Sequence, residues 1–274
     1  MSSSGFLFSG PTSRPRTPVW LGVLLLFFAG TPAGVGAAEL LDATDRALLG
    51  RLGSDVKRTA IPAIDPDRLI EAFTRAQSWP FTIMEGPKKG QQVELSVQAP
   101  SRLPGSGKAL DTPVWALEIP GVMKQYAEVT GEGLQSPIIM LDRGTFAASY
   151  LPYDPVLLRK IDFGQSKTFA MQVKVHPQSD FSETEYEGQI QATYTNKGSY
   201  RFDTPSGTYD GVIIATEYRG TLGPATMDNR NLRIYSPKDG LVAMVAHDRL
   251  HAILLVDEDK FITLLRAAPA RSDH

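Results

Sequence analysis

Two histidines near the C-terminus are the sharpest candidates for chemistry in this sequence. His247 and His251 have the i, i+4 spacing that places two zinc ligands on one helix face, although Asp248 stands where the zinc-protease motif has glutamate. The flanking residues are rich in valine and isoleucine and instead indicate two strands, with the histidines facing each other across a hairpin loop at residues 248–250. Catalytic zinc needs three protein ligands. The two histidines are therefore interpreted in two ways, as the polar end of a hairpin or as the metal ligands of a hydrolase.

Two further segments match parts of catalytic motifs. Residues 103–108 resemble a phosphate-binding loop, but Arg102 stands where that loop needs glycine and Ala109 where it needs serine or threonine. Ser54 and Lys57 have the Ser-x-x-Lys spacing of serine acyl-transfer enzymes, whose partner motifs are absent. No catalytic constellation is complete, so the sequence favours a non-enzymatic protein, and no cofactor is predicted.

Aromatic residues in neighbouring predicted strands are the candidates for ligand binding. On the inner face of a curved sheet such residues either pack as core or line a cavity for an apolar ligand such as a lipid. A row of glutamates at 183, 185 and 187 would share the outer face of one strand and could bind a partner protein in the cell envelope. The candidate ligand-binding residues are Tyr186, Tyr194, Tyr200, Phe202, Tyr209 and Tyr218.

Most of the chain has the period of two that is typical of half-buried antiparallel strands. Apolar and polar residues alternate over 93–99, 169–175 and 186–194, and residues 196–198 predict a hairpin turn into a strand at 200–202. Further runs lie at 212–218, 231–235, 241–246, 252–256 and 261–266, separated by turn-like segments such as 236–240 and 257–260. Successive strands without intervening helices predict a meander.

Helices are predicted only at the start of the mature chain. Leucine and alanine recur at helical spacing over 39–52. A second helix has Asp65 as its cap and Pro66 in its first turn, and Pro80 ends it. We expect an α+β fold, mainly β: a curved antiparallel meander sheet, shaped as a half-barrel or clam, with two short N-terminal helices. The predicted segments are a signal peptide at 1–38, a helical segment packing on the sheet at 39–90 and the β domain at 91–274.

The first 38 residues have the order of a secretory signal peptide. Arg14 and Arg16 precede an apolar run of about a dozen residues, and small residues close the segment before Glu39. An uncleaved inner-membrane anchor is the alternative, but a span needs about 20 apolar residues. Cleavage would leave no transmembrane span and would change the formal net charge from −2 to −4. We expect a periplasmic protein without disulfides, since cysteine is absent, and no binding to nucleic acid.

The C-terminal half carries one family resemblance. Residues 204–211, then Tyr218, Gly220, Gly223 and residues 235–237 and 240–243, resemble the strand-turn-strand pattern of uncharacterised bacterial periplasmic β-sheet proteins, which are similar in fold to the lipoprotein-carrier class. The resemblance implies a sheet that clasps something apolar. The leading hypothesis is an exported, non-enzymatic protein that binds a hydrophobic ligand or an envelope partner. The alternatives are the hydrolase that uses His247 and His251, and an envelope assembly or structural factor.

Overall fold

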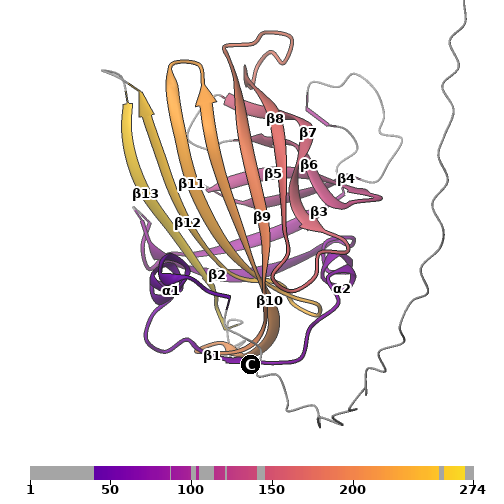
Figure 1. The fold of residues 1–274 in the computed structure, drawn as a ribbon, viewed down its shortest axis with the longest axis vertical. Helices are drawn as coiled ribbons and strands as arrows, with labels where there is room; N and C mark the ends of the chain where they lie inside the picture. Colours follow the sequence, from indigo (N-terminus) through magenta and orange to yellow (C-terminus); the bar gives the residue numbers. More distant parts are fainter. Residues whose placement is uncertain are drawn as a thin grey trace, which may run out of the picture. The chain divides into compact units, whose positions relative to one another are not determined.

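The computed structural model describes residues 40–86, 88–99, 103–104, 114–120, 122–140, 146–252 and 256–268 (Figure 1). The predicted signal peptide, residues 1–38, and most of the segment 103–108 that resembles a phosphate-binding loop lie outside this range. The described helices are α1 (Ala43–Gly50) and α2 (Asp67–Glu71), and neither is long and apolar enough to cross a membrane. The described strands are β1 (Lys57–Ala60), β2 (Gln77–Glu85), β3 (Gln92–Gln98), β4 (Val114–Ile119), β5 (Met123–Thr130), β6 (Gly133–Met140), β7 (Phe146–Leu158), β8 (Ser166–Pro177), β9 (Tyr186–Thr204), β10 (Gly207–Leu222), β11 (Ala225–Ser236), β12 (Gly240–Ala252) and β13 (Val256–Arg266).

The described strands form one antiparallel sheet that closes on itself. Hydrogen-bonded neighbours run from β9 through β13, continue with β2 to β8, and return to β9 through the β8–β9 pairing. Twelve of these strands therefore make a barrel, and β1 pairs only with the end of β9. The mainly β, antiparallel fold and the two short helices are confirmed. The predicted half-barrel or clam is wrong, because closure pairs the two edges that an open sheet would expose.

The largest apolar cluster fills the interior of the barrel. Its members come from strands all around the closed sheet, including Phe81 on β2, Leu117 on β4, Tyr194 on β9 and Leu264 on β13. The helix α2 adds Leu69 and Ile70 to the same cluster, and Phe73, just after the helix, joins them, so the apolar side of α2 packs into the barrel. Much of the barrel interior is thus a packed apolar core, and α2 contributes side chains to it.

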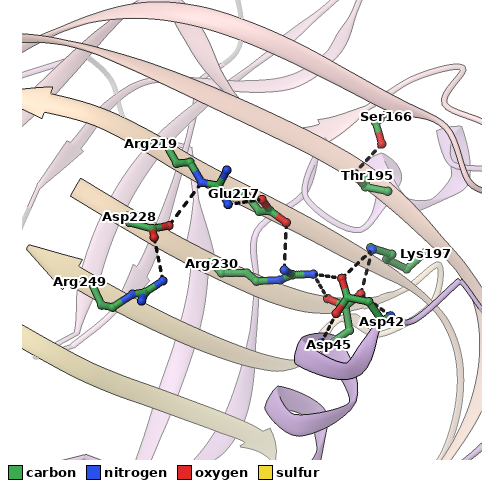
Figure 2. A network of polar contacts seen from close by, with 10 residues as sticks. All are labelled: Asp42, Asp45, Ser166, Thr195, Lys197, Glu217, Arg219, Asp228, Arg230 and Arg249. Carbon is green, nitrogen blue, oxygen red and sulfur yellow. Dashed lines mark hydrogen bonds and ion pairs between the residues drawn. The ribbon is translucent and has the colours of Figure 1, made fainter. Parts of the chain in front are cut away.

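The helix α1 packs against the outside of the wall formed by β9 to β13. Leu48, Leu49 and Leu52 share a second apolar cluster with outward-facing residues of that wall, such as Phe202 and Val245. In Figure 2, polar contacts join the start of the helix to Lys197 on β9 and Arg230 on β11, and Arg230 in turn contacts Glu217 on β10. The apolar and the polar contacts together hold α1 against the outside of this wall.

The carboxylate of Asp45 is the centre of these polar contacts (Figure 2). It is fully buried and lies 2.8 Å from the Lys197 ammonium and 2.6 Å from the Arg230 guanidinium. Asp42, the helix N-cap, accepts a hydrogen bond from the Asp45 backbone and contacts Arg230 at 2.7 Å. A buried carboxylate is stable only when paired in this way.

A β-bulge reverses the two faces of β9. Ile214 pairs with Asn196 and Ile213 pairs with Gly198, so Lys197 is an extra residue without a partner on β10. Gly198 has φ +107°, a conformation that favours glycine. The hairpin turn predicted at 196–198 is therefore wrong: β9 continues through it. Because one extra residue shifts the alternation, even-numbered side chains face inward before the bulge and outward after it.

Two other sequence predictions differ from the structure. The second helix ends at Glu71, and β2 runs through Pro80, so the helical segment predicted for 39–90 is wrong beyond α2. Trp79, Phe81 and Ile83 alternate into the barrel, which is the period of a strand. Residues 248–250, predicted as a hairpin loop, belong to β12, and residues 257–260, predicted as a turn, belong to β13.

Candidate functional site inside the barrel

A group of ionisable side chains interrupts the apolar filling of the barrel. We call it the interior polar cluster. Its members belong to β7, β10, β11 and β12, which the closed sheet brings to face one another. Perturbed ionisable groups in a concave interior are the usual mark of a functional site. The cluster consists of Tyr150 and Asp154 on β7, Tyr218 on β10, Arg233 and Tyr235 on β11, and Asp248 on β12.

Asp154 is the buried carboxylate of the cluster. The Tyr218 hydroxyl donates to it, at 3.0 Å from Oδ1 and 3.2 Å from Oδ2. Burial raises the pKa of Asp154 to about 6, although the charge of Arg233 and the Tyr218 hydrogen bond act in the opposite direction. Burial likewise raises the pKa of Tyr218 far above its ordinary value. Asp154 can therefore change its protonation state near neutral pH.

Arg233 supplies the positive charge of the cluster. Its guanidinium lowers the pKa that burial alone would give to Asp154, Tyr150 and Asp248, which lie on two different strands. Burial disfavours the charged guanidinium, but the guanidinium donates a hydrogen bond to the Tyr235 hydroxyl, and this contact and the other cluster members keep the pKa of Arg233 above its ordinary value. Arg233 therefore stays charged inside the barrel.

The guanidinium of Arg233 is charged but has no close counter-ion in the part of the chain that the structure describes. No ion pair with an N–O separation of 4.0 Å or less joins it to a carboxylate of the described residues. Arg233, Tyr150 and Asp248 also remain half-buried although each lies inside the closed sheet. Side chains that keep accessible surface inside a barrel face space instead of packed atoms. The cluster is therefore only partly covered, and water can reach it.

A small cavity with mostly apolar walls lies next to Arg233. Its volume is about 20 Å³, which is enough for an ordered water molecule. The walls are mostly apolar, and Gln125, Arg233 and Tyr235 are the polar residues among them. Met123 and Met244 belong to the wall, and methionine side chains adapt readily to a change of shape. The remaining lining residues are Phe73, Leu95, Leu117, Ile119, Val156 and Leu241.

The six aromatic residues predicted to bind a ligand do not share one face. Tyr194 and Tyr218 lie inside the barrel, each less than one-tenth exposed, and the Tyr194 hydroxyl accepts from the Leu158 backbone. Tyr200 and Phe202 lie outside under α1 because of the bulge at Lys197.

The other two aromatic candidates lie near the ends of the sheet. Tyr209 packs against the same outer cluster, and Tyr186 is 43 % exposed at the start of β9. Of the predicted set, the structure brings Tyr218 into the interior polar cluster and places Tyr194 close enough for the charges of Arg233 and Tyr235 to act on it.

The predicted metal ligands have separate surroundings on the outer wall. His247 stacks on Phe261 at 4.0 Å between ring centroids, and its Nε2 lies 2.7 Å from Asp259. His251 is exposed and pairs with residue 257 of β13. Residues four apart on one strand are separated by about 13 Å, so the two do not form the close ligand set that one ion needs. The described residues contain no group of three His, Cys, Asp or Glu side chains able to hold a metal.

Sequence reasoning missed Arg233 and Asp154. A signal for Arg233 was present: it shares the parity of Tyr235 and alternates with Leu232 and Ile234 in a strand that is buried on both faces. A lone charge in such a strand indicates a functional position. Comparisons with protein families, with curated proteins and with solved structures find no match.

Proposed function

We propose that this protein is an exported binding protein whose barrel interior takes a small ligand with an apolar body and a polar head. The observation that carries the proposal is Arg233: a charged guanidinium inside the barrel, at the edge of an apolar cavity and without a close counter-ion among the described residues. Apolar walls with a few convergent polar groups are typical of small-molecule sites. The signal-like order of residues 1–38 supports a location in the periplasm.

The size of the cavity sets how a ligand would enter. At about 20 Å³ it holds water and no larger molecule, so an apolar body has to displace side chains of the wall. Phe73, which follows the short helix α2, and the two methionines are the side chains best placed to move, because α2 is a single short turn and methionine is unbranched. A short apolar chain requires less displacement than a long acyl chain.

The proposal is tested by the binding of a neutral apolar dye, N-phenyl-1-naphthylamine, to purified protein freed of bound ligand. Met244→Phe adds bulk to the wall of the cavity, whereas Met84→Phe makes the same change beside the outer cluster under α1. We expect saturable dye binding that Met244→Phe weakens by about tenfold, the equivalent of about 1.4 kcal/mol, and that Met84→Phe leaves unchanged. Absence of saturable binding, or equal loss in both variants, would contradict an interior site.

A further inference from the structure

We infer that the polar head of the ligand is a single oxyanion, such as a carboxylate, held by Arg233 and Tyr235. This inference rests on the proposed function and adds the sign of the charge. It is not obvious from composition, because the interior polar cluster contains two carboxylates and one guanidinium. The charge that the ligand head must carry depends on which of these groups borders the cavity.

Arg233 is the charged residue that borders the cavity. Neither Asp154 nor Asp248 is among the residues that line it. Asp154 is also already engaged, since the Tyr218 hydroxyl lies within 3.2 Å of both of its oxygens. A ligand in the cavity therefore meets a positive charge first, and the carboxylates lie behind it.

The donors of Arg233 suit an oxyanion. A guanidinium carries five N–H donors in a planar fork that binds carboxylate through two parallel hydrogen bonds. Tyr235, two residues along β11 on the same face, adds a hydroxyl beside that fork. An oxyanion there would supply the close counter-ion that the structure lacks, in a setting of low dielectric where such a pair is strong.

The neighbouring carboxylates do not forbid an anion. Burial raises the pKa of Asp154 to about 6 and also raises that of Asp248, so both groups are closer to neutral than exposed carboxylates. Lys260, on the adjacent β13, partly offsets the charge of Asp248, although Lys260 is also paired with Glu258, which acts on Asp248 in the opposite direction. The interior therefore tolerates one additional negative charge more readily than a count of its carboxylates suggests.

The test compares three ligands of one chain length as competitors of the neutral dye: octanoate, octan-1-ol and octylamine. At a fixed neutral pH we expect octanoate to displace the dye at a concentration about 10- to 100-fold below octan-1-ol, the range that hydrogen bonds to a charged group provide. Octylamine should be the weakest of the three. This comparison uses the unaltered protein and does not depend on whether a variant folds.

Two variants locate the effect. Arg233→Met should abolish the preference for octanoate, whereas Arg249→Met, which removes an exposed arginine on the outer wall, should preserve it. Equal displacement by octanoate and octan-1-ol would overturn the oxyanion head and leave the interior site standing. Failure of the dye itself to bind would overturn the proposed function and this inference with it. A preference for octanoate that survives Arg233→Met would place the head elsewhere.

Discussion

Replacing Asp154 by asparagine should stabilise this protein at neutral pH and leave its stability at acid pH nearly unchanged. Asparagine has the shape of the protonated acid and keeps an oxygen to accept from Tyr218. Burial raises the pKa of Asp154 from 3.8 to about 6. Because one pKa unit corresponds to about 1.36 kcal/mol, the rise corresponds to about 3 kcal/mol in the free energy of unfolding.

The sign of the effect follows from proton binding. The folded protein binds a proton at Asp154 more tightly than the unfolded chain does. Protonation therefore contributes stability that is fully present below the unfolded pKa of 3.8 and is lost as the pH rises through about 6. The variant lacks this titration. The difference between its free energy of unfolding and that of the natural protein therefore grows as the pH rises from 3.8 to about 6.

Urea unfolding of both proteins near pH 4 and near pH 7.5 measures the effect. We expect the variant to gain up to about 3 kcal/mol relative to the natural protein between the two pH values. Asp210→Asn is the control: the hydrogen bond from Arg201 lowers the pKa of Asp210, so no gain at neutral pH is expected. An equal effect of Asp154→Asn at both pH values would refute the description of the interior polar cluster.

Three further predictions concern the walls and the leader. Asp45→Asn leaves two cations without their buried partner and should cost about 3 kcal/mol, whereas Asp42→Asn keeps a helix cap at an exposed position and should cost under about 1 kcal/mol; thermal unfolding compares them. Ile190→Asp faces the interior and should cost about 3 kcal/mol or more, and the outward Gln191→Asp under about 0.5 kcal/mol; similar denaturation midpoints would contradict the register. Terminal sequencing of protein from its own cells should begin at residue 38 or at Glu39, and an intact N-terminus on membrane-bound material would indicate an anchor.

Strands with one solvated face were predictable from the sequence. The alternation at 93–99, 169–175 and 186–194 corresponds to β3, β8 and the first half of β9. The strands β4 and β6 lack that alternation because both of their faces are largely buried. Leu117 faces the interior, while Val114 and Ala116 lie under an outer cluster that includes Phe181. Near-continuous apolar runs give no period to recognise.

Barrel closure and the bulges were not predictable by periodicity. Closure depends on pairing between β8 and β9 and between β13 and β2, strands whose partners cannot be read from local pattern. The extra residue Lys197 reverses the face of everything after it, which moved Tyr200 and Phe202 out of the predicted ligand site. A single bulge therefore decides which aromatic residues a ligand can meet.

The location of a bound ligand tests the central claim most directly. Isotope-edited NMR of the natural protein, with labelled methionine methyl groups and octanoate as the ligand, measures which methyl groups lie close to the octanoate chain. The cavity wall contains Met123 and Met244, whereas Met84 packs outside the barrel under α1. We expect contacts from octanoate to the first two methyl groups and none to the third. Contacts to Met84 without contacts to Met244 would contradict an interior binding site.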